Sequence, residues 1–141
     1  MQINTETLER MIRDIIEEKT DADGVMKVSL PTVSVGEENR LDTGNPVHKV
    51  YTKDLFDLKQ SPRLGCGIME MENTTFDWTL DYDEIDYIID GSLTIITQNG
   101  RKTAEAGELI LIPKGSAIKF SVEGHARFLY VTYPADWSNM G

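Results

Sequence analysis

The sequence predicts an all-β domain, an antiparallel sandwich or barrel, preceded by a short amphipathic helix. The part of the chain after residue 47 is divided by turn residues: Gly91, Asn99-Gly100, Gly107, Gly115 and Gly124. Asn-Gly is a strong signal for a two-residue hairpin. The intervening segments are rich in β-branched and aromatic residues and show no helical period, so we expect strands at 92–98, 101–105, 108–112, 117–122 and 126–133.

The helix is predicted over residues 5–19. Apolar side chains recur along one face with helical spacing, and the opposite face is charged: the apolar set is Leu8, Met11, Ile12, Ile15 and Ile16. An isolated helix of this length is marginal in water, so it needs a surface to pack against. A polar stretch at 20–24 ends it. We therefore divide the chain into a helix and linker at 1–24 and a β domain at 25–141, beginning with a connector at 25–46 and a possible short strand at 25–30.

The composition narrows the classes of partner. The net charge is -10 and the pI is about 4.6, which disfavours nucleic acid and anionic membranes as partners. There is one cysteine, Cys66, so no intramolecular disulfide forms, as is usual in a reducing compartment. No basic and apolar N-terminal signal and no apolar run of membrane-spanning length are visible. We expect a cytoplasmic protein.

Two spacings identify a motif. In "EIDYIIDG", Glu84 precedes Gly91 by seven positions, and in "GELILIPKGS", Gly107 is followed by Pro113 and Gly115. These segments resemble the two halves of the cupin signature. The resemblance implies a small jelly-roll barrel with a central pocket lined by alternate residues of its strands.

Metal-binding cupins carry two histidines shortly before the glutamate and a third after the second half of the motif. The corresponding positions here lie within 77–80 and at Ile118, and none is histidine; His48 and His125 lie outside the motif. We therefore expect no tightly bound metal. The alternative is a set of oxygen ligands, which would favour magnesium, calcium or manganese: Asp77, Asp83, Glu84 and Asp86.

Longer stretches are similar to the family of the ethanolamine utilisation protein EutQ. They are "ENRLDTGNP", "TTFDWTLDYDEIDYIIDGSLTI" and "IPKGSAIKFSVEGHARFLYVTYPADW", and the similarity extends over about 38–137. The resemblance implies an accessory role in ethanolamine catabolism, in or beside a bacterial microcompartment. It also implies a possible acetate kinase activity, which has been attributed to the family.

The acidic run supplies candidate catalytic residues. Strand alternation places Glu84 and Asp86 on one face, which points into the barrel if Glu84 keeps the cupin orientation. Burial and a neighbouring carboxylate both raise the pKa of an acid, so this pair and Tyr82 are candidates for acid-base chemistry. In the alternative interpretation, tyrosine hydroxyls and backbone amides satisfy the acids structurally. The other candidate pocket residues are Asp77, Trp78, Asp83, Ile118, Phe120, Tyr51 and Arg127.

Three functions stay open on the sequence. The first is an accessory or assembly protein of the microcompartment, whose N-terminal helix resembles an encapsulation peptide and binds shell proteins. The second is an enzyme, an acetate kinase that uses the Glu84 and Asp86 pocket with Mg and ATP, although no phosphate-binding loop is present. The third is a cupin that binds a small molecule without turnover. Fold analogy adds an expected homodimer.

Overall fold

The structure is a computed structural model, and it describes residues 5, 7, 8 and 23–136. Two units divide the chain, at residues 1–34 and 35–141. Residues 5, 7 and 8 are helical; the remainder of the predicted helix, including Met11, Ile12, Ile15 and Ile16, lies outside the described residues. Within those residues, no helix has the length and apolar character needed to cross a membrane.

The short strand that was considered for residues 25–30 is absent, and this part of the prediction is wrong. Residues 25–29 have irregular backbone, and a 3-10 helix, η1 (Leu30–Thr32), follows. Pro31 lies in its first turn, where the missing N–H of proline costs no hydrogen bond. The predicted connector continues through η2 (Glu37–Asn39) to the first strand.

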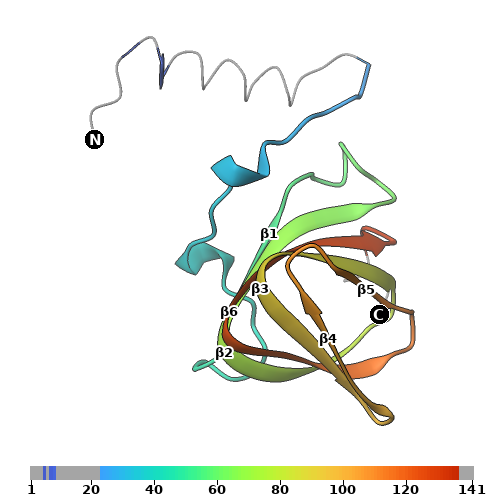
Figure 1. Ribbon diagram of the computed structural model, residues 1–141. Coiled ribbons are helices and arrows are strands. Elements are labelled where there is room, and N and C mark those ends of the chain that lie inside the picture. The colour runs from blue at the N-terminus through green and yellow to red at the C-terminus, as the bar shows by residue number, and fades with distance from the viewer. Residues whose placement is uncertain (1–4, 6, 9–22, 137–141) are drawn as a thin grey trace. The chain divides into compact units, whose positions relative to one another are not determined.

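The second unit is an antiparallel β structure, as predicted. Its strands are β1 (Lys49–Asp54), β2 (Gly65–Thr79), β3 (Asp83–Thr97), β4 (Gly100–Glu105), β5 (Leu109–Ile112) and β6 (Ala117–Tyr133). They form one sheet in the order β1-β2-β6-β3-β4, with β5 paired to β3. Figure 1 shows the long strands β2, β3 and β6 curving around a common centre. The sheet therefore encloses a core between its two curved layers.

Two expected strand ends are not strand ends. β3 continues through Gly91 and β6 continues through Gly124, both of which have positive φ. A side chain at Gly91 would overlap the carbonyl oxygen of His125 in the neighbouring strand. Glycine is therefore needed here because two backbones approach closely, and not because the chain turns.

The predicted hairpin is present between β3 and β4. Thr97 pairs with Gly100, so the two loop residues are Gln98 and Asn99. The loop is offset by one residue from the Asn99-Gly100 signal, and Gly100 begins β4 with a φ of 134°. This φ lies in the region that only glycine adopts readily.

Candidate functional site

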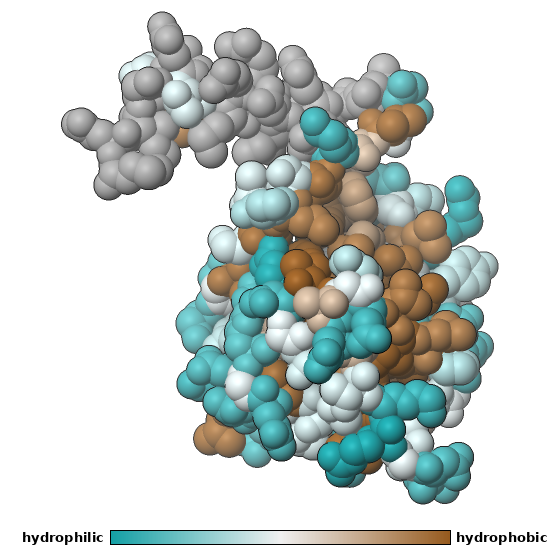
Figure 2. Space-filling model, viewed as in Figure 1, coloured by the Kyte–Doolittle hydropathy of each residue, from teal (hydrophilic) through white to brown (hydrophobic). Residues whose placement is uncertain are grey.

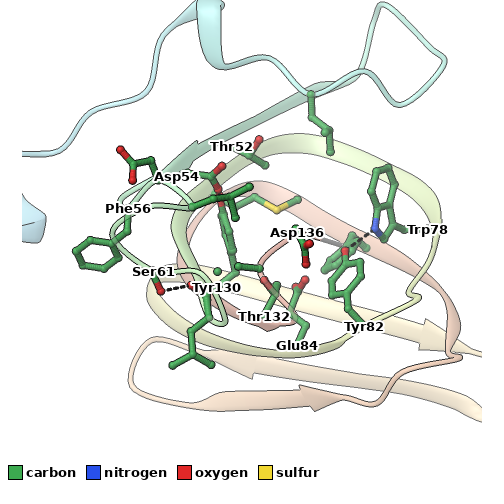
Figure 3. Close-up of a pocket in the computed structure, with 18 of the residues that line it drawn as sticks. Thr52, Asp54, Phe56, Ser61, Trp78, Tyr82, Glu84, Tyr130, Thr132 and Asp136 are labelled. Carbon is green, nitrogen blue, oxygen red and sulfur yellow. Dashed lines mark hydrogen bonds between the residues drawn. The ribbon is translucent and has the colours of Figure 1, made fainter. Parts of the chain in front are cut away.

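The described residues of the barrel line a cavity with a volume of about 640 Å³. Its walls come from strands β1, β2, β3 and β6, from the loop at residues 55–64 and from the segment after β6. The side chains at the loop, including Leu58 and Lys59, are exposed and mark the mouth. The lining residues labelled in Figure 3 are Thr52, Asp54, Phe56, Ser61, Trp78, Tyr82, Glu84, Tyr130, Thr132 and Asp136.

One wall of the cavity is aromatic. The indole Nε1 of Trp78 donates a hydrogen bond of 2.8 Å to the hydroxyl of Tyr82, which is buried. Phe76 stacks on Phe120 with a centroid distance of 5.3 Å and meets Trp78 edge to face at 5.9 Å. Phe76 and Trp78 face the same side because they are two positions apart in β2. Burial raises the pKa of Tyr82, so its hydroxyl stays protonated at neutral pH.

The facing wall in Figure 3 is built around Tyr130. Its hydroxyl donates a hydrogen bond of 2.6 Å to Asp54 Oδ1, and burial raises its pKa. The ring lies over Gly67 in β2, where an added Cβ would overlap the Tyr130 hydroxyl and ring. A Cβ added at Gly65 would likewise overlap the side-chain hydroxyl of Thr132. The two glycines therefore leave the room that these β6 side chains occupy.

A pair of acids lies between these walls. Glu84 lines the cavity and is 5% exposed, whereas Asp86 is fully buried next to Glu84 on the same face of β3. Both Asp86 oxygens lack a hydrogen-bond donor among the described residues. Burial raises the pKa of Glu84, and burial together with the Glu84 charge raises the pKa of Asp86 well above its ordinary range. The pair therefore retains a proton to higher pH than exposed carboxyls do.

The strand alternation predicted for this pair is confirmed. Glu84, Asp86 and Ile88 are buried, and Ile85 and Tyr87 between them are exposed. No register shift interrupts β3 before Ile88, so the period of two holds over the whole acidic run. Whether the acids and Tyr82 take part in catalysis stays a prediction.

Two predicted pocket acids face away from the cavity, and these assignments are corrected. Asp77 lies between two inward-facing residues of β2, and its exposed carboxylate pairs with Lys119 of the adjacent strand. Asp83 precedes Glu84 and so has the opposite parity, and its Oδ1 accepts a hydrogen bond from the Lys114 backbone. The proposed set of oxygen ligands is therefore not assembled around Glu84.

Two further predicted pocket residues take part in ion-pair networks elsewhere. The Tyr51 hydroxyl contacts Arg40 and Glu37. Arg127 Nη1 lies 2.8 Å from Glu70 Oε2, and neither Tyr51 nor Arg127 lines the cavity. Proximity to the motifs in sequence favoured Arg127, and the frequency with which aromatic residues line pockets favoured Tyr51. The pairing of β1 and β6 with β2 directs both to other partners.

The prediction that two residues of β6, Ile118 and Phe120, point into the barrel pocket holds in part. Ile118 and Phe120 are both buried as expected, but only Phe120 lines the cavity, while Ile118 packs in the core beside it. The sequence reasoning missed Asp54, Thr132 and Asp136. Asp54 and Thr132 share the alternation of inward residues in their strands, which is the signal that could have found them.

The acidic side chains of the described residues do not form a metal site. Across residues 23–136 and the three described positions before them, no group of three or more His, Cys, Asp or Glu side chains is arranged to hold a metal ion. The donor set present is one buried acid pair and scattered carboxylates. A resident metal therefore does not fit the described residues.

Comparisons with known proteins agree with this geometry. The family model of "Ethanolamine utilisation protein EutQ" matches residues 3–139. The chain is 57% identical to "Acetate kinase EutQ" of Clostridioides difficile (strain 630), over 97% of this chain and 96% of that protein. It is 36% identical to "Acetate kinase EutQ" of Salmonella typhimurium over 86% of this chain, but it spans only 51% of that longer protein.

Solved structures give the same result. The structure of the Clostridium difficile EutQ protein superposes with a TM-score of 0.83 at 64% identity, covering 86% of this chain and 88% of that one. The Schizosaccharomyces pombe Cnp3 cupin domain, at 15% identity, has a TM-score of 0.60 over 82% of this chain and 79% of that one and shows the fold alone. The chain has the cupin fold that its motif predicted, and it belongs to the ethanolamine utilisation protein EutQ family.

Proposed function

We propose that this protein is an enzyme of ethanolamine utilisation that transfers a phosphoryl group between MgATP and acetate, and that acetate binds in the barrel cavity. The observation that carries the proposal is the 57% identity to a protein named acetate kinase EutQ, because it covers nearly all of both chains. This favours the catalytic alternative over a purely accessory role. The cavity offers a partly apolar space with buried polar groups, which is the usual form of a small-molecule site.

The chemistry constrains what the cavity residues do. One acetate oxygen forms a bond to the γ-phosphorus of ATP while the bond from that phosphorus to the β-γ bridging oxygen breaks, which gives acetyl phosphate and ADP. Acetate enters as an anion, so no base has to remove a proton. Catalysis then depends on positioning and on neutralising charge, as is general for phosphoryl transfer. On this proposal Glu84 and Tyr82, which line the cavity, bind and orient the substrate, and fully buried Asp86 acts on it only through Glu84.

MgATP reaches the site as a substrate with its own metal ion. Lys59, at the mouth, is the one cationic side chain among the described residues that line the cavity. We assign it to the phosphates of ATP. The segment "IPKGS" has no such part in the proposal, because Lys114 and Gly115 lie in the turn between β5 and β6 and do not line the cavity.

The test is formation of acetyl phosphate by the purified full-length protein with MgATP and acetate, trapped as a hydroxamate. We expect turnover by the wild type. Replacing Lys59 with Ala should raise the KM for MgATP about tenfold, or roughly 1.4 kcal/mol of binding. Lys102→Ala is the matched control, since Lys102 is exposed on β4 outside the cavity. A wild type that forms no acetyl phosphate would overturn the function.

A second role is proposed for the N-terminal segment, and the apolar stripe of the sequence favours it. Leu8, which is described, is 48% exposed, so its side chain is available to a partner. We propose that the predicted helix recruits the protein to a microcompartment by inserting this stripe into a groove of a shell protein. This role is compatible with catalysis by the barrel.

Recruitment is tested with charged substitutions on the stripe. Ile12→Asp with Ile15→Asp should abolish co-fractionation with microcompartment shells while acetyl phosphate formation by the purified protein is unchanged. Glu9→Gln, on the charged face, is the control and should co-fractionate as the wild type does. Unchanged co-fractionation of the double variant would remove this role.

A further inference from the structure

The Glu84 and Asp86 pair has no cationic ion-pair partner within the part of the chain that the structure describes. On either side along the sheet, Glu84 pairs with Ile112 and Thr132, and Asp86 pairs with Ile110 and Tyr130. Among the described residues, neither acid has an ion pair with a lysine, arginine or histidine. The other titratable groups facing the same cavity are Asp54, Asp57, Lys59, Tyr82, Tyr130 and Asp136.

Two carboxylates in this position need a proton between them. Asp86 is fully buried and its two oxygens have no donor among the described residues. A hydrogen bond between Asp86 and its neighbour Glu84 forms only if one of the two acids is protonated, because an ionised carboxylate accepts hydrogen bonds and donates none. A shared proton removes one of two like charges and satisfies a buried acceptor at once.

This arrangement also removes a difficulty for an anionic substrate. Two ionised acids at the wall of a cavity would repel acetate, whereas a protonated acid can donate a hydrogen bond to it. Hydrogen bonds between an acid and a carboxylate are short and among the strong ones. The apolar rings of Phe76 and Phe120 lie in the same cavity and offer a surface for a short alkyl group.

We propose that Glu84 and Asp86 act as one acid pair that carries two protons in the ligand-bound state. Asp86 holds one and donates a hydrogen bond to Glu84, and Glu84 takes up the second from solvent and donates a hydrogen bond to the carboxylate of a small monocarboxylate. The proposal rests on the proposed function and names the group that selects acetate. Apart from the proton that Glu84 takes up from solvent, only hydrogen bonds form in this step, and both protons stay with the pair. Glu84 is thus a binding residue, and Asp86 is the positioning residue behind it that keeps the proton in place.

The proposal fixes the sign of a pH effect. Raised pKa values of both acids support it, since the pair then keeps its protons to higher pH than exposed carboxyls do. As pH rises, Glu84 loses its proton, so the donor is lost, the pair becomes negatively charged and affinity for an anion falls. A cation such as ethanolamine would show the opposite sign, because it binds better to an ionised pair.

The experiment is calorimetric titration of the full-length protein with acetate and, separately, with ethanolamine, from about pH 6 to about pH 10, where acetate is ionised. We expect the Kd for acetate to rise about tenfold per pH unit above the point where the pair ionises, with uptake of a proton on binding. Two buffers of different ionisation enthalpy measure that uptake. Ethanolamine should not bind.

Two variants separate the donor from the carboxyl group itself. Glu84→Gln keeps a donor that does not titrate, so acetate binding should persist with a weaker pH dependence than in the wild type, because only Asp86 of the pair still ionises. Glu84→Leu keeps the bulk and has no donor, so acetate binding should be lost. Thermal unfolding of each variant establishes that it is folded. Acetate binding by folded Glu84→Leu at wild-type affinity would overturn the proposal.

The remaining outcomes are distinguishable from failure of the enzyme proposal. A Kd for acetate that is constant over the pH range, absence of acetate binding, or ethanolamine binding that tightens with pH would overturn the acid pair. If acetyl phosphate is still formed in those cases, the proposed function stands alone. Acetate binding with the expected pH dependence but without acetyl phosphate would retain the acid pair and remove the kinase.

Discussion

The Nε1 of Trp78 lies 2.8 Å from the hydroxyl oxygen of Tyr82, and this hydrogen bond joins the end of β2 to the residue that precedes β3. It fixes the Tyr82 hydroxyl at the cavity wall two positions before Glu84. Trp78→Phe removes the donor while keeping an aromatic ring. We expect a loss of about 1 kcal/mol in the free energy of unfolding from the hydrogen bond, measured in urea.

The matched control for that substitution is Tyr82→Phe, which removes the acceptor. If the bond accounts for the loss, the double variant Trp78→Phe/Tyr82→Phe should be more stable than the sum of the single losses predicts. Fully additive losses would show that this hydrogen bond contributes little.

The acid pair should make stability depend on pH. In the unfolded chain both carboxyls have a pKa of about 4, and burial raises both pKa values in the folded protein. The folded state therefore binds more protons between the unfolded and folded pKa values, so the free energy of unfolding falls as pH rises through that window. Asp86→Asn removes one ionisation, and its stability relative to the wild type should rise by about 1.4 kcal/mol per pH unit inside the window.

Urea unfolding of the wild type and of Asp86→Asn at several pH values measures this difference. The pH range, from about 5 to about 9, starts near the pKa of the carboxyls in the unfolded chain. Taking the difference between the two proteins removes the contribution of surface groups such as Glu37, whose pKa is lowered by Arg40. Parallel curves for the two proteins would contradict the prediction.

Gly67 should be intolerant of a side chain. Its Cβ would overlap the Tyr130 hydroxyl and ring, so Gly67→Ala must displace the ring or the strand. Overpacking of this kind costs roughly 1–3 kcal/mol, and displacement of Tyr130 should also break its hydrogen bond to Asp54. Thermal unfolding measures the loss.

Gly36→Ala serves as the control, because the added Cβ meets only the flexible carboxylate of Glu38. In the background of Tyr130→Ala, the loss from the Gly67 substitution should be smaller but not absent, since the ring is gone while the backbone carbonyl oxygen of Lys53 still lies 2.6 Å from the added Cβ. An equal loss in both backgrounds would indicate that the backbone at residue 67, and not Tyr130, limits the substitution.

The outer face of the sheet carries apolar side chains that the fold leaves exposed. Ile85 pairs with Leu111 of β5 and with Val131 of β6, and Leu111 and Leu109 are more than 60% exposed. In Figure 2, brown apolar side chains gather on the side of the barrel where Figure 1 shows β5. An uncharged patch is self-complementary, which an interface with two-fold symmetry requires. We therefore predict that two copies associate through this face.

Ile85→Lys should convert the predicted dimer to a monomer in sedimentation velocity experiments, because it buries an unpaired charge in each half of the interface. Val47→Lys is the control, since Val47 is also exposed but lies in the connector before β1. A wild type that sediments as a monomer, or a dimeric Ile85→Lys, would contradict the prediction.

The sequence alone determined the class of fold and the local geometry of the acidic run. Alternation with a period of two is a property of a single strand, so the inward direction of Glu84 and Asp86 followed from the order of residues. The hairpin at Asn99 also followed, because turn preferences act between neighbouring residues. The resemblance to the cupin motif predicted that the strands form a barrel.

Only the tertiary structure decided which distant residues share the cavity. Asp54 meets Tyr130 because β1 and β6 both pair with β2 in a particular register, and no local pattern encodes that register. The same pairing turned Asp77 and Arg127 toward ion-pair partners outside the cavity. Gly91 shows the same limit of prediction from sequence. Its sequence pattern indicates a turn, whereas the structure places it where the backbones of β3 and β6 approach closely.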